Sequence, residues 1–349
     1  MRLLKLNENK FFKKPVKKDK YISKEILKYS IGTNLYMNGF KNFYKKIKDG
    51  SFKNLSSISI CFEDSTREED LKLCEKNVQS MLLELSKEVG ETIPLLFIRV
   101  RNITQFKSFI KETKDEALKL IAGFIFPKFN SENGEEYFEI LSKLNKEKNE
   151  IFYGMPIIEE KKVLYKETRI EELLKIKKIV DKNKELVLNI RVGGTDFSSK
   201  FGLRRSRENI IYDISVVRDC LSDILNIFLR AEEDYVISAP VWEYFSNDVD
   251  SIEMRSFIKE IKMDKENGFI GKTIIHPMQI GIVNSLYIVT FEEYMDAIEI
   301  IEAKEGVFKG YGDNKMNEAK PHMNWAKRIL KRSEAYGVLN KGISYIELL

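Results

Sequence analysis

The stretch FYGMPIIEE, residues 152–160, is a mostly apolar run that ends in two carboxylates, Glu159 and Glu160. Such a run is typical of a strand that is buried on both faces of a parallel sheet. Five further predicted strands also end on polar or charged residues: residues 58–62 before Glu63 and Asp64, 94–98 before Arg99 and Arg101, 123–127 before Lys128, 186–192 before Asp196, and 269–275 before His276. A parallel barrel places all such strand ends on one face, where (β/α)8 enzymes have their active sites. The six ends therefore predict an active site.

Strand-like segments alternate with helix-like segments along the whole chain. Residues 31–36 and 235–241 bring the predicted strands to eight, and residues 206–229 are among the predicted helices. No glycine-rich phosphate loop follows the first strand, which argues against a dinucleotide-binding fold. The pattern predicts an α/β protein, a (β/α)8 TIM barrel with extra C-terminal helices.

The predicted organisation has three parts. Residues 1–29 form a basic N-terminal arm, residues 30–289 the barrel, and residues 290–349 a C-terminal helical extension. Thr290 and Glu293 have capping-box spacing and open the first helix of that extension. A glycine-containing turn at residues 310–313 leads to a last helix around residues 323–333.

Composition indicates a folded protein with a solvated surface. Of 349 residues, 43% are hydrophobic and 32% charged, and the net charge is only +5 because lysines and glutamates are interspersed. This balance does not indicate a nucleic-acid partner. The arm carries Lys10, Lys13, Lys14, Lys17, Lys18 and Lys20. We interpret it as a surface arm, with a phosphate or nucleic-acid contact as the alternative.

Cysteine spacing and hydropathy suggest a cytoplasmic location. Cys61, Cys74 and Cys220 have neither metal-ligand nor disulfide spacing, so buried thiols in a reducing compartment are expected. No apolar run is long enough to span a bilayer, and the N-terminus has no signal-peptide core.

Glu159 and Asp196 are the predicted metal ligands. Two carboxylates at the ends of adjacent strands repel each other unless a cation lies between them, and oxygen ligands suit Mg2+. Gly193 and Gly194 before Asp196 allow a close approach of ligand or backbone. The alternative is that each carboxylate caps a helix or pairs with a lysine.

Arg99 and Arg101 are two residues apart on a predicted strand, so both side chains are expected on one face. An arginine in a barrel mouth is costly unless it meets an anion, such as a substrate carboxylate. The alternative is an ion pair with Glu63 or Asp64.

His276 is a candidate base or substrate contact, and the alternative is a structural histidine that bonds a neighbouring loop. Arg204, Arg205 and Arg207 form a basic cluster after Asp196. One interpretation is that they bind a phosphate group of the substrate. The alternative is that they are surface residues at the start of a helix.

The chain resembles the citrate lyase beta-subunit and malyl-coenzyme A lyase group of the HpcH/HpaI aldolase superfamily. The resemblance rests on GFIGKTIIHPMQI at residues 268–280, CFED at 61–64, RVRN at 99–102, FPK at 126–128, IE at 158–159 and GTD at 194–196. These matches follow the family order from about residue 30 to residue 336.

Three departures separate the chain from that group. Cys61 replaces the first Asp of the acidic motif, Asn38 stands where Pro is usual, and Glu318 stands where the lyases carry Asp. The segment RVGGTDFS at residues 191–198 is closer to a divergent branch found with tellurite-resistance genes, whose members are expected to be carbon–carbon lyases.

The resemblance implies a Mg2+-dependent carbon–carbon lyase or aldolase that cleaves a 2-oxo or 3-hydroxy acid through a metal-stabilised enolate. Coenzyme A, an acyl carrier protein or neither would carry the substrate. The implied catalytic residues are Arg99, Glu318, Glu63 and Asp64, and the implied substrate contacts are Lys128, Arg191, Arg204 and His276. It also implies a homo-oligomer, a trimer, in which Glu318 reaches the active site of another subunit. The alternatives are a phosphorylated sugar or nucleotide-like substrate, and a non-catalytic binding or regulatory barrel.

Overall fold

The computed structural model describes residues 8–88, 93–303 and 305–348. The chain forms two compact units. The barrel unit is Thr33–Ile280, and the terminal unit combines the residues up to Gly32 with those from Gly281 onward.

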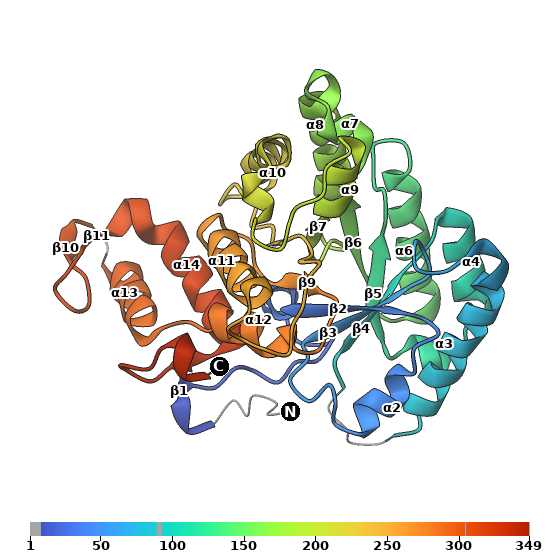
Figure 1. Ribbon diagram of the computed structural model, residues 1–349, viewed down its shortest axis with the longest axis horizontal. Coiled ribbons are helices and arrows are strands. Elements are labelled where there is room, and N and C mark those ends of the chain that lie inside the picture. The colour runs from blue at the N-terminus through green and yellow to red at the C-terminus, as the bar shows by residue number, and fades with distance from the viewer. Residues whose placement is uncertain (1–7, 89–92, 304, 349) are drawn as a thin grey trace. The chain divides into compact units, whose positions relative to one another are not determined.

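Eight strands form one parallel sheet in the barrel unit (Figure 1). They are β2 (Thr33–Asn38), β3 (Ser57–Cys61), β4 (Leu95–Arg99), β5 (Ile121–Phe126), β6 (Tyr153–Ile158), β7 (Ile190–Val192), β8 (Ile237–Ser238) and β9 (Lys272–Ile274). Their order is β8-β7-β6-β5-β4-β3-β2-β9, and a parallel bridge between Ala239 and Lys272 joins the two outer strands of this order. The sheet is therefore closed, and the predicted (β/α)8 barrel is confirmed.

Helices follow the strands around the barrel. They are α2 (Phe43–Lys48), α3 (Leu71–Leu85), α4 (Ile103–Glu112), α5 (Asp115–Leu118), α6 (Gly134–Lys148), α7 (Lys161–Leu164), α8 (Lys166–Lys182), α9 (Gly194–Lys200), α10 (Ser215–Phe228) and α11 (Ile252–Glu266). The next helix, α12 (Gln279–Tyr287), begins at the end of the barrel unit and belongs mostly to the terminal unit. Each long helix buries one stripe of apolar side chains, as on α10, where Val217, Leu221 and Ile224 are buried.

The helix predicted at residues 206–229 is wrong at its start, because α10 begins only at Ser215. The preceding loop is held against α11 instead. Glu260 of α11 accepts hydrogen bonds from the backbone N–H of Ile211 at 2.7 Å and from Nη1 of Arg205 at 2.5 Å. These long-range contacts replace the helical bonds that the sequence pattern favoured.

Part of the barrel interior is polar rather than apolar. Asn34 on β2 donates from Nδ2 to Ser57 Oγ at 2.8 Å and accepts at Oδ1 from Ser59 Oγ at 2.6 Å. All three side chains are buried. Their mutual hydrogen bonds offset the cost of removing them from water.

The terminal unit contains α1 (Lys24–Ser30), α13 (Phe291–Glu302), α14 (Ala319–Tyr336) and two small antiparallel sheets. The sheets pair β1 (Phe11–Lys13) with β12 (Val338–Leu339), and β10 (Val307–Lys309) with β11 (Met316–Glu318). The described part of the basic arm thus joins the C-terminal segment. The predicted capping box of Thr290 and Glu293 opens α13, and α13 packs on α14 through Ala297, Ile300 and Ile329. Both extra C-terminal helices are confirmed.

Among the described residues, no helix is long and apolar enough to cross a membrane. The three cysteines are buried and none is in a disulfide.

Candidate functional site

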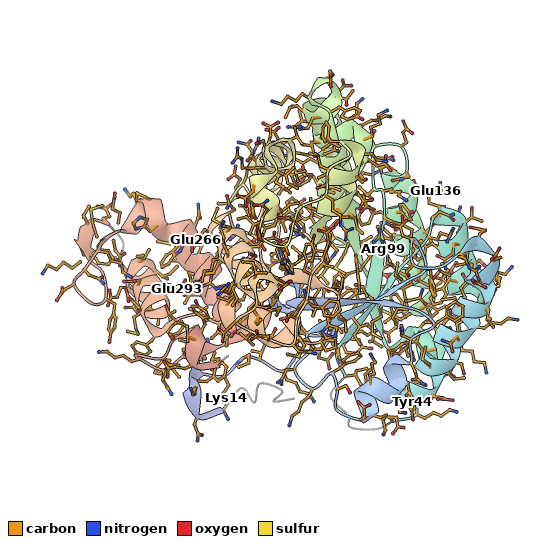
Figure 2. All side chains as sticks on the ribbon, viewed as in Figure 1. Lys14, Tyr44, Arg99, Glu136, Glu266 and Glu293 are labelled. Carbon is orange, nitrogen blue, oxygen red and sulfur yellow. The ribbon has the colours of Figure 1, made fainter. Side chains whose placement is uncertain are left out.

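Most of the predicted site residues lie at the carboxyl ends of neighbouring barrel strands. Glu63 and Asp64 follow β3, Arg99 ends β4, Lys128 follows β5, Glu159 follows β6, Arg191 lies in β7, and Asp196 lies in α9 just after β7. In Figure 2, Arg99 lies among the strands, whereas Tyr44 and Glu136 lie on the outer helices. The barrel thus gathers residues that are far apart in the chain.

Glu159 is buried at the end of β6, and one of its carboxylate oxygens is held by the protein. Oε1 accepts the backbone N–H of Lys128 at 2.8 Å and lies 3.4 Å from Nη2 of Arg99. Lys128 has φ 48°, in the left-handed region that a non-glycine residue seldom adopts. This costly backbone conformation positions a donor for Glu159, and strain of this kind is frequent at functional sites.

The other oxygen of Glu159 faces Asp196 across Gly193. A Cβ at Gly193 would lie 2.6 Å from Oε2 of Glu159, 2.5 Å from its Cβ and 3.1 Å from Oδ2 of Asp196. A side chain at this position would therefore collide with both carboxylates. The absence of a side chain is what lets the two acids share one space.

The electrostatics of Glu159 fit a cation site. Burial raises the pKa of Glu159 to about 8; Arg99 opposes the rise, and Asp196 adds to it. A divalent cation between Glu159 and Asp196 would favour the charged form of both carboxylates, in addition to the ion pair that Arg99 makes with Glu159. Within residues 8–88, 93–303 and 305–348, no group of three or more His, Cys, Asp or Glu side chains has a metal-binding arrangement. Two carboxylates with water and substrate oxygens suffice for Mg2+, so the residues present fit that ion.

Arg99 is buried among carboxylates. It forms ion pairs with Glu63, with Asp64 at 3.6 Å and with Glu159 at 3.4 Å, so the pairing expected as an alternative is present. Burial disfavours its charged form, yet Tyr36 and Glu159 raise the pKa of Arg99 above its ordinary value. Arg99 is therefore a fixed positive charge beside the two candidate metal ligands.

Lys128 and Glu63 complete this charged cluster. The Lys128 ammonium lies 2.7 Å from Oε1 of Glu63 and 3.7 Å from Oδ1 of Asp64. Burial raises the pKa of Glu63, while Arg99 and Lys128 oppose the rise. Asp64 is exposed and Glu63 is buried, so the two acids differ in their access to solvent.

Arg101 does not join the site, so the expectation that it shares a face with Arg99 is wrong. Strand β4 ends at Arg99, and the alternation of side chains ends with it. Arg101 donates to the carbonyl oxygens of Phe62 at 3.3 Å and Thr66 at 2.8 Å, and pairs with Glu68 at 2.8 Å. Its role is to hold the loop after β3.

Two side chains of the site were not among the predicted site residues, although Thr273 lies within the motif at residues 268–280. Tyr36 on β2 and Thr273 on β9 line a cavity of about 60 Å³ together with Arg99, Glu159, Arg191 and Asp196. The Tyr36 ring centroid lies 5.5 Å from Cζ of Arg99 and 5.8 Å from Cζ of Arg191. Both residues lie in barrel strands, and a position that faces the barrel interior was the sequence signal that could have identified them.

His276 and Arg204 do not line this cavity. His276 stacks on Phe245 with ring centroids 4.1 Å apart, and its Nδ1 accepts the backbone N–H of Met278 at 3.3 Å. Arg204 is exposed. Its neighbour Arg205 is buried, bonded to Glu243 at 2.8 Å and placed over the Trp242 ring at 4.7 Å.

Glu318 lies in the terminal unit, at the end of β11 and the start of α14. Its backbone N–H donates to Nδ1 of His322 at 3.0 Å, and its side chain is partly buried. The turn before β11 is closed by a hydrogen bond from Asp313 N to Gly310 O at 3.0 Å, where the sequence predicted a turn.

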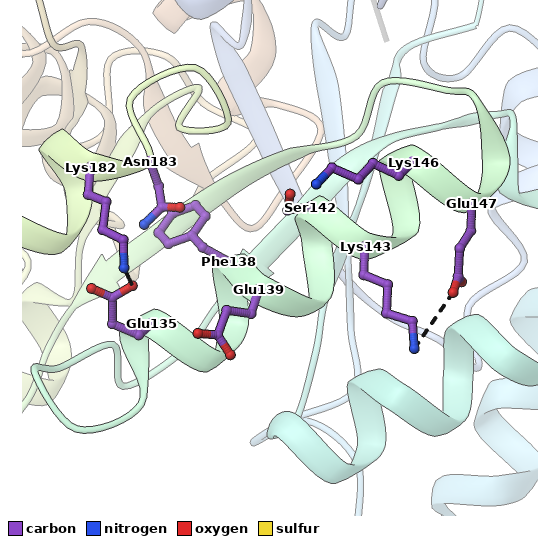
Figure 3. Close-up of a pocket in the computed structure, with 9 residues that line it drawn as sticks. All are labelled: Glu135, Phe138, Glu139, Ser142, Lys143, Lys146, Glu147, Lys182 and Asn183. Atoms are coloured by element: carbon purple, nitrogen blue, oxygen red, sulfur yellow. Dashed lines mark hydrogen bonds and ion pairs between the residues drawn. The ribbon is translucent and has the colours of Figure 1, made fainter.

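A larger hollow of about 520 Å³ lies on the outer surface between α6 and α8 (Figure 3). Four of its charged side chains pair with one another, Lys182 with Glu135 at 2.8 Å and Lys143 with Glu147 at 3.6 Å. Because those charges are paired and exposed, this hollow does not compete with the barrel mouth as a candidate site.

Comparisons with known proteins agree with the barrel fold. A family model described as a C–C bond lyase of the TIM-barrel fold matches residues 25–338. Citrate lyase subunit beta of Leuconostoc mesenteroides subsp. cremoris is 34% identical over 95 residues, which are 26% of this chain. The match spans 32% of that relative's length.

Solved structures share the fold at low identity. A citrate lyase from Burkholderia xenovorans LB400 has a TM-score of 0.66 and 16% identity, over 87% of this chain and 92% of that one. The protein CitE from Mycobacterium tuberculosis, in complex with magnesium, acetoacetate and coenzyme A, has a TM-score of 0.56 and 15% identity, over 88% and 99%. At these identities the likeness shows the fold alone.

Proposed function

This chain belongs to the family of carbon–carbon bond lyases with the TIM-barrel fold, and we propose that it is a Mg2+-dependent lyase or aldolase that cleaves a 2-oxo or 3-hydroxy acid. The observation that carries the proposal is the meeting of Glu159 and Asp196 across Gly193, beside Arg99. Two buried or partly buried carboxylates that can hold a metal ion, together with the permanent positive charge of Arg99, suit a substrate that develops negative charge next to a carbonyl.

Glu159 and Asp196 are the residues that would hold Mg2+. When bound, the ion supplies a Lewis acid that polarises the substrate carbonyl. The similar fold of the CitE protein crystallised with magnesium and acetoacetate supports this assignment. The backbone N–H of Lys128 donates to Oε1 of Glu159 and so fixes the orientation of this carboxylate. Its other oxygen, Oε2, is directed towards Asp196.

Arg99 is proposed to stabilise the enolate. In cleavage, the carbon–carbon bond breaks and its electron pair stays on the carbon next to the carbonyl. In a 3-hydroxy acid, the hydroxyl proton leaves to a carboxylate, and Glu63 and Asp64 are the proposed acceptors. Arg99 pairs with both acids and also lines the cavity of Glu159 and Asp196, which supports a role of its guanidinium in stabilising the developing negative charge.

A proton must then reach the enolate carbon, and Glu318 of another subunit is the proposed donor. We propose a homo-oligomer, a trimer, on the strength of the family resemblance. Coenzyme A, an acyl carrier protein or neither carries the substrate; the complex of CitE with coenzyme A supports the first. The proposed location is the cytoplasm, supported by the three buried thiols.

A substrate screen tests the proposal. The purified chain is incubated with 2-oxo and 3-hydroxy acids, free and as coenzyme A thioesters, with Mg2+ or with chelator, and cleavage products are measured by mass spectrometry. We expect Mg2+-dependent cleavage of at least one acid by the wild type and none by Glu159→Gln. If acids bind in a Mg2+-dependent way but none is cleaved, a non-catalytic binding barrel becomes the better description.

A further inference from the structure

Asp196 is the less firmly held of the two candidate metal ligands. Glu159 is fixed by the backbone N–H of Lys128 and by Arg99. In the part of the chain that the structure describes, no hydrogen bond or ion pair reaches the carboxylate of Asp196. The negative charge of Glu159 also repels it. The position of Asp196 therefore depends on how firmly the backbone at the start of α9 is held.

The start of α9 is connected to the segment that follows β8. Thr195, which directly precedes Asp196, donates from Oγ1 to Oε1 of Glu243 at 3.3 Å. Thr195 and Val241 both line the cavity of Asp196, whereas Glu243 lies behind them and does not line it. A single hydrogen bond of this length can hold a helix in place only if its acceptor is itself fixed.

Arg205 fixes that acceptor. Its side chain is only 4% exposed, and its Nε donates to Oε2 of Glu243 at 2.8 Å. Nη1 donates to Glu260 of α11 at 2.5 Å, and Nη2 donates to the carbonyl oxygen of Val241. The hydroxyl of Tyr244 donates to the carbonyl oxygen of Arg205 at 2.7 Å. All three guanidinium nitrogens thus bond groups of the protein, so Arg205 is committed to this frame and not to a substrate phosphate.

The frame continues to the barrel wall. Glu260 is fully buried, and its Oε1 lies 2.9 Å from Nζ of Lys272 in β9. Lys272 also pairs with Asp264 of α11 at 2.6 Å. Buried charges of this kind are costly to separate from their partners. The contacts from Lys272 through Glu260 and Arg205 therefore give Glu243 a fixed position beside α9.

We propose that Glu243, held by Arg205, is a positioning residue for Asp196. Through Thr195 it fixes the start of α9, so that the carboxylate of Asp196 stays opposite that of Glu159, where the two can share a metal ion. The inference rests on the proposed metal-dependent function and deepens it, because it says how one ligand is kept in place. Outer partners of metal ligands commonly orient them in this way.

A double-mutant cycle on Mg2+ binding tests the inference. Titration calorimetry on the full chain measures the Mg2+ affinity of Thr195→Val, which loses the hydroxyl, of Thr195→Ser, which keeps it, of Glu243→Ala, and of the double variant with Thr195→Val and Glu243→Ala. The control is Glu253→Ala. Glu253 pairs with Arg207 at 3.1 Å and so ties the same loop to α11, and its side chain is 20% exposed, as is that of Glu243.

Thr195→Val and Glu243→Ala should each weaken Mg2+ binding about three- to tenfold, which is less than the roughly 10–100-fold effect of removing a partner that bonds a ligand directly. Thr195→Ser and Glu253→Ala should bind Mg2+ as the wild type does. The double variant should bind no more weakly than Glu243→Ala alone, because both changes remove the same contact.

Hydrogen–deuterium exchange in the presence of chelator gives a second readout that needs no metal. Exchange at residues 194–200 should be faster in Thr195→Val and Glu243→Ala than in the wild type, and unchanged in Thr195→Ser and Glu253→Ala. Thermal unfolding of Thr195→Val should match that of the wild type, because Thr195 is exposed. If Glu243→Ala does not fold, the comparison of Thr195→Val with Thr195→Ser decides the question.

Wild-type Mg2+ affinity in Thr195→Val and in folded Glu243→Ala would overturn the inference. Additive losses in the double variant, or an equal loss in Glu253→Ala, would overturn it as well. If the wild type itself binds no Mg2+, the proposed metal-dependent function fails. In that case faster exchange in α9 would still support the hold of Glu243 on this helix, and unchanged exchange would refute it.

Discussion

Lys128 and Glu159 are joined by a backbone hydrogen bond of 2.8 Å, for which Lys128 adopts a left-handed conformation with φ 48°. The bond fixes one oxygen of Glu159 and leaves the other directed across Gly193 towards Asp196. An unfavourable conformation at the end of one strand thus orients a candidate metal ligand at the end of the next.

Glu159→Gln and Asp196→Asn should each remove measurable Mg2+ binding, because each replaces a charged oxygen ligand with a neutral amide. Titration calorimetry on the folded proteins measures this. Glu160→Gln is the matched control, since Glu160 follows Glu159 directly and carries no site contact in our assignment. Wild-type affinity in both site variants would refute the metal assignment.

Gly193→Ala should weaken Mg2+ binding by an order of magnitude or more while the barrel remains folded. The added methyl would lie 2.5 Å from Cβ of Glu159 and 2.6 Å from its Oε2, so the carboxylate has to move. Gly194→Ala is the control, because its methyl would press on Cβ of Pro240 at 2.9 Å and not on either acid. Calorimetry with circular dichroism compares them, and an equal effect of the two changes would contradict the argument.

Arg99→Lys should lower kcat/KM. The expected loss of transition-state stabilisation is roughly 2–4 kcal/mol, which is the scale of one lost oxyanion donor. Lysine keeps the charge but not the planar pair of donors. Steady-state kinetics on a substrate from the screen measures the change. Arg101→Lys serves as the control, since Arg101 bonds the loop after β3. Unchanged turnover in Arg99→Lys would exclude the proposed role.

The stability of the metal-free protein should depend on pH through Glu159. Its pKa is raised by burial to about 8 in the folded state, against an ordinary value of 4.5. Between those two values the folded state binds more protons at this group than the unfolded state, so stability falls as pH rises. Glu159→Gln mimics the protonated form.

We therefore expect Glu159→Gln to match the wild type near pH 5 and to exceed it near pH 8, by on the order of a few kcal/mol in the free energy of unfolding. Urea unfolding in the presence of chelator at both pH values measures the difference. A variant that is equally or less stable than the wild type at both values would show that burial does not hold Glu159 protonated.

A mixture of Glu318→Gln and Glu159→Gln subunits should regain part of the wild-type activity if Glu318 serves the site of another subunit. Some sites in the mixed oligomer would then combine two intact halves. Glu159→Gln mixed with Asp196→Asn is the control, because both residues belong to the same half and no site is restored. No recovery despite demonstrated subunit exchange, or a strictly monomeric protein, would count against the shared site.

Strand-end chemistry predicted much of the candidate site. Glu63, Arg99, Lys128 and Glu159 all follow apolar runs that became barrel strands, and the parallel order brought them together. The prediction for Arg101 was wrong because the end of β4 could not be located to within two residues. Local pattern gives the existence of a strand more reliably than its last residue.

The sequence by itself determined the eight strands, their alternation with helices and the strand ends at which the acids and arginines lie, because alternation and apolar runs are local properties of the chain. Only the tertiary structure decided which of them share one cavity. Strand register and barrel closure decide which side chains meet. They leave Nη1 of Arg191 buried without a hydrogen-bond partner among the described residues, leave room for two carboxylates at Gly193, and place Lys128 in a left-handed conformation. These are set by contacts between segments that are distant in sequence, and no short motif encodes them.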